Sequence, residues 1–186
     1  MSELLQRPKR ADARRNYEKL LEAARSAFAE LGVSASLEEI ARRADVGIGT
    51  LYRHFPTRQA LIEAVYVEEV EALARSAGEI AELEPWDALV EWFHRFVGYA
   101  VRKRVLIEEL VATMGKDAGV LARCRTELQS AGEPLLQRAQ AAGLVRPDAN
   151  YTDVARMVAA IAVTPVEPEQ VGRMVDLALD GLRYRA

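Results

Sequence analysis

The sequence is poor in the residues on which several protein classes depend. It has one cysteine, Cys124, so no intramolecular disulfide can form, which suits a reducing compartment. Aromatic residues make up only 6% of the chain, whereas alanine, leucine, glutamate and arginine are abundant and favour helices. No apolar run approaches the roughly 18 residues that a membrane span requires. No apolar stretch precedes the early basic residues, so we expect a cytoplasmic protein without a secretory signal or a membrane partner.

Residue patterns that indicate an enzyme are also missing. The two histidines, His54 and His94, are far apart, and the cysteine has no histidine near it in the sequence. There is no glycine-rich phosphate loop, metal-ligand spacing or serine-centred elbow. Acidic pairs such as Glu68-Glu69 are typical of a solvated helix surface. We therefore expect no enzyme activity, no metal site and no cofactor.

The net charge of −3 conceals an asymmetry between the two ends of the chain. Residues 1–60 carry 11 Lys and Arg against 8 Asp and Glu, and the remainder carries 14 against 20. A basic arm attracts a polyphosphate partner, although the same charges also occur in solvated, disordered tails. Six cations fall within the first 19 residues: Arg7, Lys9, Arg10, Arg14, Arg15 and Lys19.

Apolar residues recur at helical spacing in every long segment, and half of the residues are hydrophobic. The pattern predicts an all-α protein of about nine helices, with no strands. Glu84-Pro85 is the clearest break, and Pro134 should kink or split the helix that contains it. The helices are expected at about 12–31, 37–44, 48–54, 58–80, 86–100, 105–114, 121–142, 154–162 and 171–182.

The segment from Ser36 to Arg58 predicts a helix-turn-helix. Ser36 and Glu39 have the spacing of a capping box, and free amides at this helix start suit a phosphate. Asp45-Val46-Gly47 forms the turn. Val46, Leu51 and Phe55 should face Ile40 and Phe28. The outward or flanking residues, which we expect to contact DNA, are Ile48, Gly49, Thr50, Tyr52, Arg53 and His54.

Several of these residues suit a DNA duplex. Gly49 allows a close approach to phosphate, and Thr50 and Tyr52 carry hydroxyl donors. Arg53 can bind guanine or phosphate with its forked guanidinium group. Arg58 can neutralise phosphate from the start of the next helix. We expect Arg14 and Arg15 of the basic arm region to join them.

The segment IARRADVGIGTLYRHFPTRQALI resembles the signature of the TetR family of bacterial transcriptional regulators. The resemblance implies that Thr50, Tyr52 and His54 touch phosphates or base edges and that Arg58 contacts phosphate. Leu51 and Phe55 match core positions. The matching residues are Ile40, Ala41, Gly49, Thr50, Leu51, Tyr52, His54, Phe55, Arg58 and Leu61.

The sequence departs from the family pattern at the turn. Gly47-Ile48 stands where Ser-Lys is frequent, so Ile48 either meets a thymine methyl or packs within the motif. Asp45 replaces a common glycine, which is acceptable because Asp tolerates turn geometry. The alternative for His54 is a packed histidine of the motif. Arg42 and Arg43 contact either phosphate or only solvent.

The family resemblance continues, more weakly, into the rest of the chain. It implies a ligand cavity between the middle helices and a four-helix dimer interface formed by the last two helices of each copy. The candidate cavity residues, which could also be plain core, are Trp86, Trp92, Phe93, Phe96, Tyr99, Met114, Cys124 and Leu128. The candidate interface residues are Met157, Val158, Ile161, Val171, Met174, Val175, Ala178 and Leu182.

These observations predict three parts and one function. Residues 1–11 form a basic arm, 12–60 a helix-turn-helix domain, and 61–186 a helical effector-binding and dimerisation domain. We expect a homodimeric repressor that a small-molecule effector releases from a palindromic operator in double-stranded DNA. Two alternatives are an enzyme with a helix-turn-helix-like start, and an activator or architectural DNA binder without an effector. The basic run Arg102-Lys103-Arg104 suits either an anionic effector or a solvated helix junction.

Overall fold

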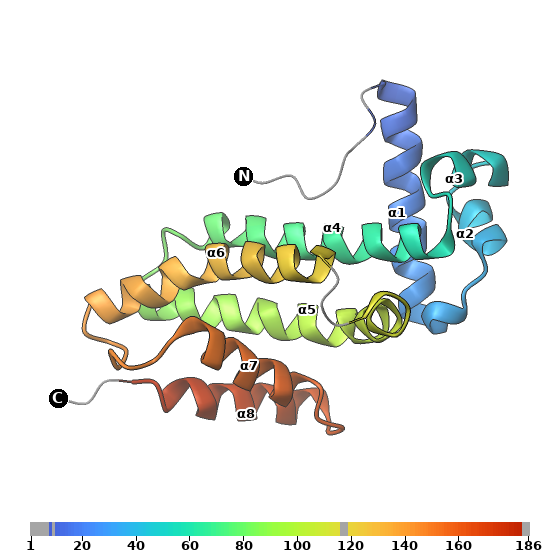
Figure 1. Cartoon of the computed structure of the whole chain (residues 1–186). Helices are drawn as coiled ribbons and strands as arrows, with labels where there is room; N and C mark the ends of the chain where they lie inside the picture. Colours follow the sequence, from blue (N-terminus) through green and yellow to red (C-terminus); the bar gives the residue numbers. More distant parts are fainter. Residues whose placement is uncertain (1–7, 9, 116–118, 184–186) are drawn as a thin grey trace. The chain divides into compact units, whose positions relative to one another are not determined.

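The computed structural model of the chain describes residues 8, 10–115 and 119–183. Over these ranges it contains helices (Figure 1) and a single isolated β-bridge, between Val145 and Arg183, which confirms the all-α prediction. None of the described helices combines the length and the apolar character needed to cross a membrane. The elements are α1 (Ala11–Leu31), the 3₁₀ helix η1 (Gly32–Ser34), α2 (Leu37–Arg43), α3 (Ile48–His54), α4 (Arg58–Glu79), α5 (Pro85–Met114), α6 (Gly119–Ala141), α7 (Tyr151–Ala162) and α8 (Pro168–Asp180).

Local chemistry explains where several of these helices begin and end. Gly32 has φ 64°, a left-handed conformation that suits glycine, and its amide bonds back to the carbonyl of Phe28 to close α1. Pro85 is the first residue of α5, where its missing N–H removes no helical hydrogen bond. The side chain of Asn150 accepts a hydrogen bond of 2.9 Å from the Asp153 amide and so caps the start of α7.

One predicted break, between 100 and 105, is wrong. α5 runs without interruption from Pro85 to Met114. The basic run of the expected junction is neutralised in the helix, because Arg104 bonds Glu108 one turn later at 3.2 Å and Arg102 bonds Glu69 of α4 at 3.0 Å.

Pro134 also does not split its helix. α6 includes it and continues to Ala141. The next two residues, Leu135 and Leu136, are buried, and their packing holds the segment helical despite the lost backbone donor.

The described residues pack into two compact units. The first comprises those within Met1–Glu69 and Arg102–Arg123, and the second those within Val70–Val101 and Cys124–Ala186. α4, α5 and α6 therefore each run from one unit into the other. The first unit is larger than the expected DNA-binding domain of residues 12–60, since it includes the first half of α4 and the last part of α5. A functional boundary at residue 60 stays a prediction.

Each unit has its own apolar core. In the first, α1 contacts α2 and α3, and α2 contacts α3 (Figure 1). Its buried side chains include Tyr17, Leu20, Phe28, Ile40, Leu51 and Phe55. In the second, α7 and α8 lie side by side. The buried side chains of this unit include Trp92, Phe93, Tyr99, Val158 and Val175.

Candidate nucleic-acid interface

The helix-turn-helix begins at a side-chain cap. The Oγ of Ser36 accepts a hydrogen bond of 3.1 Å from the amide of Glu39, which confirms the predicted start of α2. The second half of the predicted capping box does not form. The Glu39 carboxylate instead accepts hydrogen bonds from Arg42 and Arg43, at 2.8 to 2.9 Å, because these cations lie one turn along the same helix.

The turn between α2 and α3 depends on a left-handed residue. Asp45 has φ 52° and is the only non-glycine residue with positive φ in the described part of the chain. Aspartate adopts this conformation more readily than most side chains do, in line with the sequence prediction. The amide of Val46 bonds the carbonyl of Ala41 at 3.0 Å, and Gly47 accepts from Thr50 at 2.8 Å to start α3. Val46 itself is half-buried rather than fully inward.

α3 has one buried face and one exposed face. Leu51 lies fully inside, and Phe55, directly after the helix, is buried as well, so both fix α3 from behind as predicted. Ile48 and Tyr52 are large side chains that nevertheless remain 39% and 46% exposed. Leaving such side chains in water is unfavourable, and it marks this face as one suited to contact with another molecule. Gly49 and Arg53 are also exposed, while Thr50 is half-buried.

The arginines of α2 and α3 differ in how they are paired. Arg43 bonds Glu39 at 2.8 Å and Glu30 at 2.9 Å, and Arg42 bonds Glu39 as well. The hydrogen bond from Arg43 lowers the pKa of the Glu39 carboxyl most, and the hydrogen bond from Arg42 lowers it further. Arg53, by contrast, has no ion pair or hydrogen bond within the described ranges. A positive charge without an internal partner is therefore available on the exposed face of α3 but not on α2.

His54 is packed within the motif. Its ring centroid lies 6.0 Å from that of Tyr17 in an edge-on arrangement and 6.3 Å from that of Phe55. Burial lowers the pKa of the imidazole, and the neighbouring Arg53 charge lowers it further, so the neutral form is favoured. A contact between His54 and DNA stays a prediction, since the ring is half-buried against α1.

Arg58 is committed to the fold by two contacts. Its Nη1 donates a hydrogen bond of 2.7 Å to the carbonyl of Ala35, just before α2. Its guanidinium carbon lies 5.8 Å from the ring centroid of Phe28, within the range of a cation–π contact. These contacts tie the first turn of α4 to the helix-turn-helix. The predicted phosphate contact would be additional to this structural role.

The basic residues at the start of the chain are only partly within the described ranges. Arg7 and Lys9 lie outside them. Arg14 and Arg15 are exposed in the first turns of α1, and Arg14 has a long ion pair of 3.8 Å with Glu18. Both arginine side chains are accessible to a phosphate backbone.

Six of the candidate cavity residues are buried within the second unit, and ring contacts link Phe93, Phe96 and Tyr99 into an aromatic cluster. The six residues are Trp92, Phe93, Phe96, Tyr99, Cys124 and Leu128. Trp86 does not belong to this cluster, because it is half-exposed and the guanidinium carbon of Arg183 lies 4.0 Å from its ring centroid. The Met114 side chain lies outside the described residues. No group of three or more His, Cys, Asp or Glu in the described ranges could hold a metal ion.

Tyr151, at the start of α7, is a member of the aromatic cluster that sequence reasoning missed. Its ring stacks on Phe93 with a centroid distance of 6.0 Å. The Tyr151 hydroxyl and the Trp92 indole N–H are buried and have no hydrogen-bond partner within the described residues. Burial raises the pKa of Tyr151 to about 12, and the nearby N–H of Trp92 opposes that rise although the two groups do not meet the geometry of a hydrogen bond. Two buried polar groups therefore stand beside apolar rings.

The last two helices present fewer of the predicted interface residues than expected. Four of them, Val158, Val171, Val175 and Leu182, are buried within their own chain, so they have almost no surface to offer a partner. Their assignment to a dimer interface stays a prediction, and in this chain the same apolar stripe packs α7 and α8 onto the rest of their own unit. Met157 is exposed, and Ile161, Met174 and Ala178 are half-buried.

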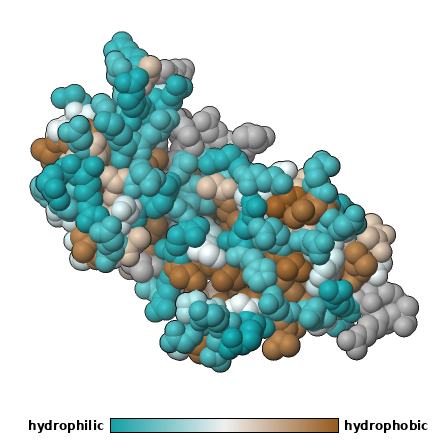
Figure 2. All heavy atoms as spheres, turned by 180° about the vertical axis from the view of Figure 1, so that it is seen from behind, coloured by the Kyte–Doolittle hydropathy of each residue, from teal (hydrophilic) through white to brown (hydrophobic). Residues whose placement is uncertain are grey.

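Leu177 was missed by sequence reasoning and is 74% exposed. It lies on α8 outside the periodic apolar stripe, and an apolar residue out of phase with its helix was the signal that could have found it. Figure 2 shows hydrophobic side chains reaching the surface among hydrophilic ones on one face of the chain.

Comparison with known proteins agrees with this geometry. Residues 20–65 match the model of the bacterial regulatory proteins of the tetR family, and residues 84–184 match that of the SbtR-like transcriptional regulator C-terminal domain. The HTH-type transcriptional regulator UidR of Escherichia coli (strain K12) is 31% identical over 173 residues, covering 89% of this chain and 88% of UidR.

Solved structures show the same fold. A TetR transcriptional regulator from Streptomyces coelicolor is 44% identical, with a TM-score of 0.77 over 91% of this chain and 99% of that one. A TetR regulatory protein from Mycobacterium vanbaalenii is 35% identical, with a TM-score of 0.73 over 95% of this chain and 100% of that one. The exposed face of α3, the match of both halves and these relatives lead to one conclusion: the chain belongs to the TetR family of DNA-binding transcriptional regulators, which are not enzymes.

Proposed function

We propose that the chain is a homodimeric repressor that binds a palindromic operator in the cytoplasm and is released from it by a small-molecule effector. The observation that carries the proposal is the exposed face of α3, where Arg53 has no ion-pair or hydrogen-bond partner among the described residues and follows the exposed Tyr52. A short helix braced from behind by Leu51 and Phe55 suits the major groove of DNA.

The exposed residues of α3 suit different contacts with DNA because their side chains differ in chemistry. Arg53 is the candidate for a forked contact to guanine, and the Tyr52 hydroxyl can bond a phosphate or a base edge. Ile48 has enough free surface to meet a thymine methyl, which supports that alternative over packing within the motif. Arg42 and Arg43, whose charges are balanced by Glu39, contribute less.

Dimerisation is proposed through α7 and α8. Leu177 and Met157 leave apolar surface in water, which association of two copies would cover. A dimer with twofold symmetry carries two copies of α3, and these read two half-sites of inverted orientation. The revised interface is therefore centred on exposed side chains rather than on Val158, Val171, Val175 and Leu182.

The effector is proposed to act on the aromatic cluster of the second unit. Phe93, Phe96 and Tyr99 are proposed to supply apolar walls, and the buried polar atoms of Trp92 and Tyr151, which form no hydrogen bond within the described residues, are proposed to orient the ligand. An effector releases DNA only to the extent that it binds the conformation unable to hold DNA more tightly than it binds the DNA-holding conformation of the dimer.

Selection of DNA from a random duplex library tests this function. The wild-type chain should enrich an inverted repeat whose half-site centres lie about one helical turn, or about 10 base pairs, apart. Light scattering should give a particle of twice the 20.6 kDa chain mass. A screen of small metabolites by thermal shift, followed by release of the selected duplex, addresses the effector. Enrichment of no sequence by a folded dimer would contradict the proposal.

A further inference from the structure

Glu69 of α4 is a buried carboxylate in a position where the sequence predicted a solvated acidic pair. It is only 8% exposed. Its Oε1 lies 2.8 Å from Nε of Arg25, and its Oε2 accepts a hydrogen bond of 3.0 Å from Nε of Arg102. Each oxygen thus has its own cation. The surface prediction for Glu69 is wrong because its partners are distant in the sequence.

The three charged groups come from three different helices of the first unit. Arg25 lies on α1, Glu69 on α4 and Arg102 on α5. Glu69 is the last residue of α4 that belongs to this unit, and Arg102 is the first residue of α5 that does. The cluster therefore stands where both helices pass from one unit to the other. α1, in turn, is the helix against which α2 and α3 pack.

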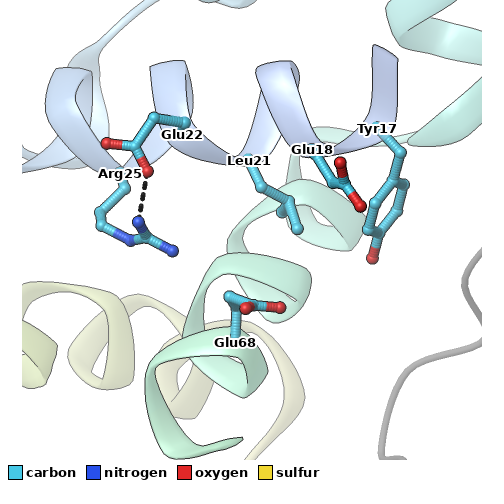
Figure 3. Close-up of a pocket in the computed structure, with 6 residues that line it drawn as sticks. All are labelled: Tyr17, Glu18, Leu21, Glu22, Arg25 and Glu68. Carbon is cyan, nitrogen blue, oxygen red and sulfur yellow. Dashed lines mark hydrogen bonds and ion pairs between the residues drawn. The ribbon is translucent and has the colours of Figure 1, made fainter. Parts of the chain in front are cut away.

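Beside this cluster, α1 and α4 are separated by a pocket of about 220 Å³. Figure 3 shows its walls, with Tyr17, Glu18, Leu21, Glu22 and Arg25 along α1 facing Glu68 on α4. Apolar packing between the two helices is incomplete at this level, so the Arg25–Glu69 pair connects them through charge. Arg25 also bonds Glu22 on its own helix, which restrains its side chain from the other side.

A buried carboxylate is costly unless it is paired, and its partners therefore determine which arrangements of the helices are acceptable. Moving α1 along or around α4 would separate Arg25 from Glu69, and moving α5 would remove Arg102. An arrangement that keeps both pairs satisfies both oxygens at once. Such a cluster contributes to a defined orientation more than to stability, since Arg25 and Arg102 are partly exposed and can be hydrated when released.

We propose that Glu69 is a positioning residue for DNA recognition, which holds α1, and with it α3, at a fixed orientation on α4 and α5 through Arg25 and Arg102. The proposal rests on the proposed function, in which two copies of α3 read two half-sites. The separation that a dimer requires between half-sites then depends on this orientation in each copy. Loosening it relaxes the preference for one spacing.

Glu69→Gln is the direct test, because the amide preserves the shape of the side chain and removes its charge. Its control is Glu79→Gln, the same change on the same helix. Glu79 is solvent-exposed and pairs at 2.6 Å with Arg95, which belongs to the second unit and not to α1. Affinity is measured for the inverted repeat selected by the wild type and for duplexes whose spacer is one or two base pairs longer or shorter.

The wild type and Glu79→Gln should share the same preference for the selected spacing. Glu69→Gln should bind the selected duplex about fivefold or more weakly, the lower end of typical couplings between sites, while its binding to the altered duplexes changes little. The ratio of the affinity for the selected duplex to the affinity for the altered duplexes should therefore fall towards one. A merely structural role would reduce the active fraction and weaken binding to all duplexes equally, and that result would overturn the proposal.

Arg102→Met provides a second variant, because Arg102 is largely exposed and its loss leaves Arg25 to balance the carboxylate. It should relax the spacing preference in the same direction even if thermal melting shows that Glu69→Gln does not fold. An Arg102→Met protein with unchanged spacing preference overturns the proposal in that case. A wild type that selects only single half-sites contradicts the dimeric operator function itself, and the positioning role falls with it.

Discussion

Gly132 on α6 lies against two buried aromatic rings, and one added methyl group there should destabilise the second unit. A Cβ atom at this position would lie 2.4 Å from Cε2 of Tyr151 and 2.6 Å from Nε1 of Trp92. Both distances are far below van der Waals contact. Trp92 is fully buried and Tyr151 nearly so, and neither ring can turn into solvent. Gly132→Ala must therefore shift α6 or push the rings from their preferred rotamers.

The size of the effect follows from two opposing contributions. Overpacking at a closely packed position costs about 1–3 kcal/mol, and alanine gains up to about 1 kcal/mol over glycine in a helix interior. We expect a net loss of about 1–2 kcal/mol in the free energy of unfolding. For a chain of this size, each 1 kcal/mol lowers Tm by about 2–4 °C, so the variant should melt about 2–8 °C below the wild type.

Differential scanning calorimetry measures this change, with Gly78→Ala as the matched control. Gly78 is exposed on α4, and an added Cβ there would meet no atom within 4 Å. That control should melt at or slightly above the wild-type temperature because of its helix propensity. The reasoning is refuted if Gly132→Ala melts at the same temperature as Gly78→Ala or above it.

Three further changes probe other parts of the account. Ser36→Ala removes the cap of α2 and should lower the free energy of unfolding by about 1 kcal/mol, as measured by thermal melting. An unchanged melting temperature would show that the Glu39 amide does not depend on this cap. Burial lowers the pKa of His54, so the unfolded chain binds a proton at higher pH than the folded chain; stability should fall as pH drops below about 6.5, and His54→Asn should flatten this slope in denaturant titrations. Leu177→Glu should convert the dimer to a monomer in light scattering, whereas Leu144→Glu should not. A Leu177→Glu protein that stays dimeric would exclude the exposed face of α8 as the dimer interface.

The helix-turn-helix could be predicted almost completely because its determinants are local. Ser36 caps a helix three residues before the amide that it binds, and Asp45 needs only its own backbone preference to form the turn. Leu51 and Phe55 are spaced by one helical turn on the inner face. Such signals lie within a few residues of their effects, and the structure reproduces them.

The cluster around Glu69 could not be predicted, since its partners lie far away along the chain. The sequence shows two adjacent glutamates on a helix, which is usually a solvated pattern. Only the packing of α1, α4 and α5 brings Arg25 and Arg102 to the two carboxylate oxygens. The same long-range pairing explains why α5 continues through a basic run that resembled a junction.

The residues of α7 and α8 show a different limit of prediction from sequence. Helical spacing identifies an apolar stripe but does not tell whether it faces the same chain or another copy. Val158 and Val175 belong to that stripe and are fully buried in the chain, whereas Leu177 lies outside it and is exposed. The distinction comes only from the packing of α7 and α8.

The central claim, that the exposed face of α3 recognises DNA, is tested most directly by the affinity of Arg53→Ala for the selected duplex, measured by fluorescence anisotropy beside Arg42→Ala. The two variants remove the same charge from neighbouring helices, but within the part of the chain that the structure describes Arg42 is paired with Glu39 and Arg53 is unpaired. Arg53→Ala should bind about 5- to 150-fold more weakly, as expected for one lost base contact of about 1–3 kcal/mol, with Arg42→Ala close to wild type. Wild-type affinity for Arg53→Ala, or an equal loss for both variants, would contradict the claim.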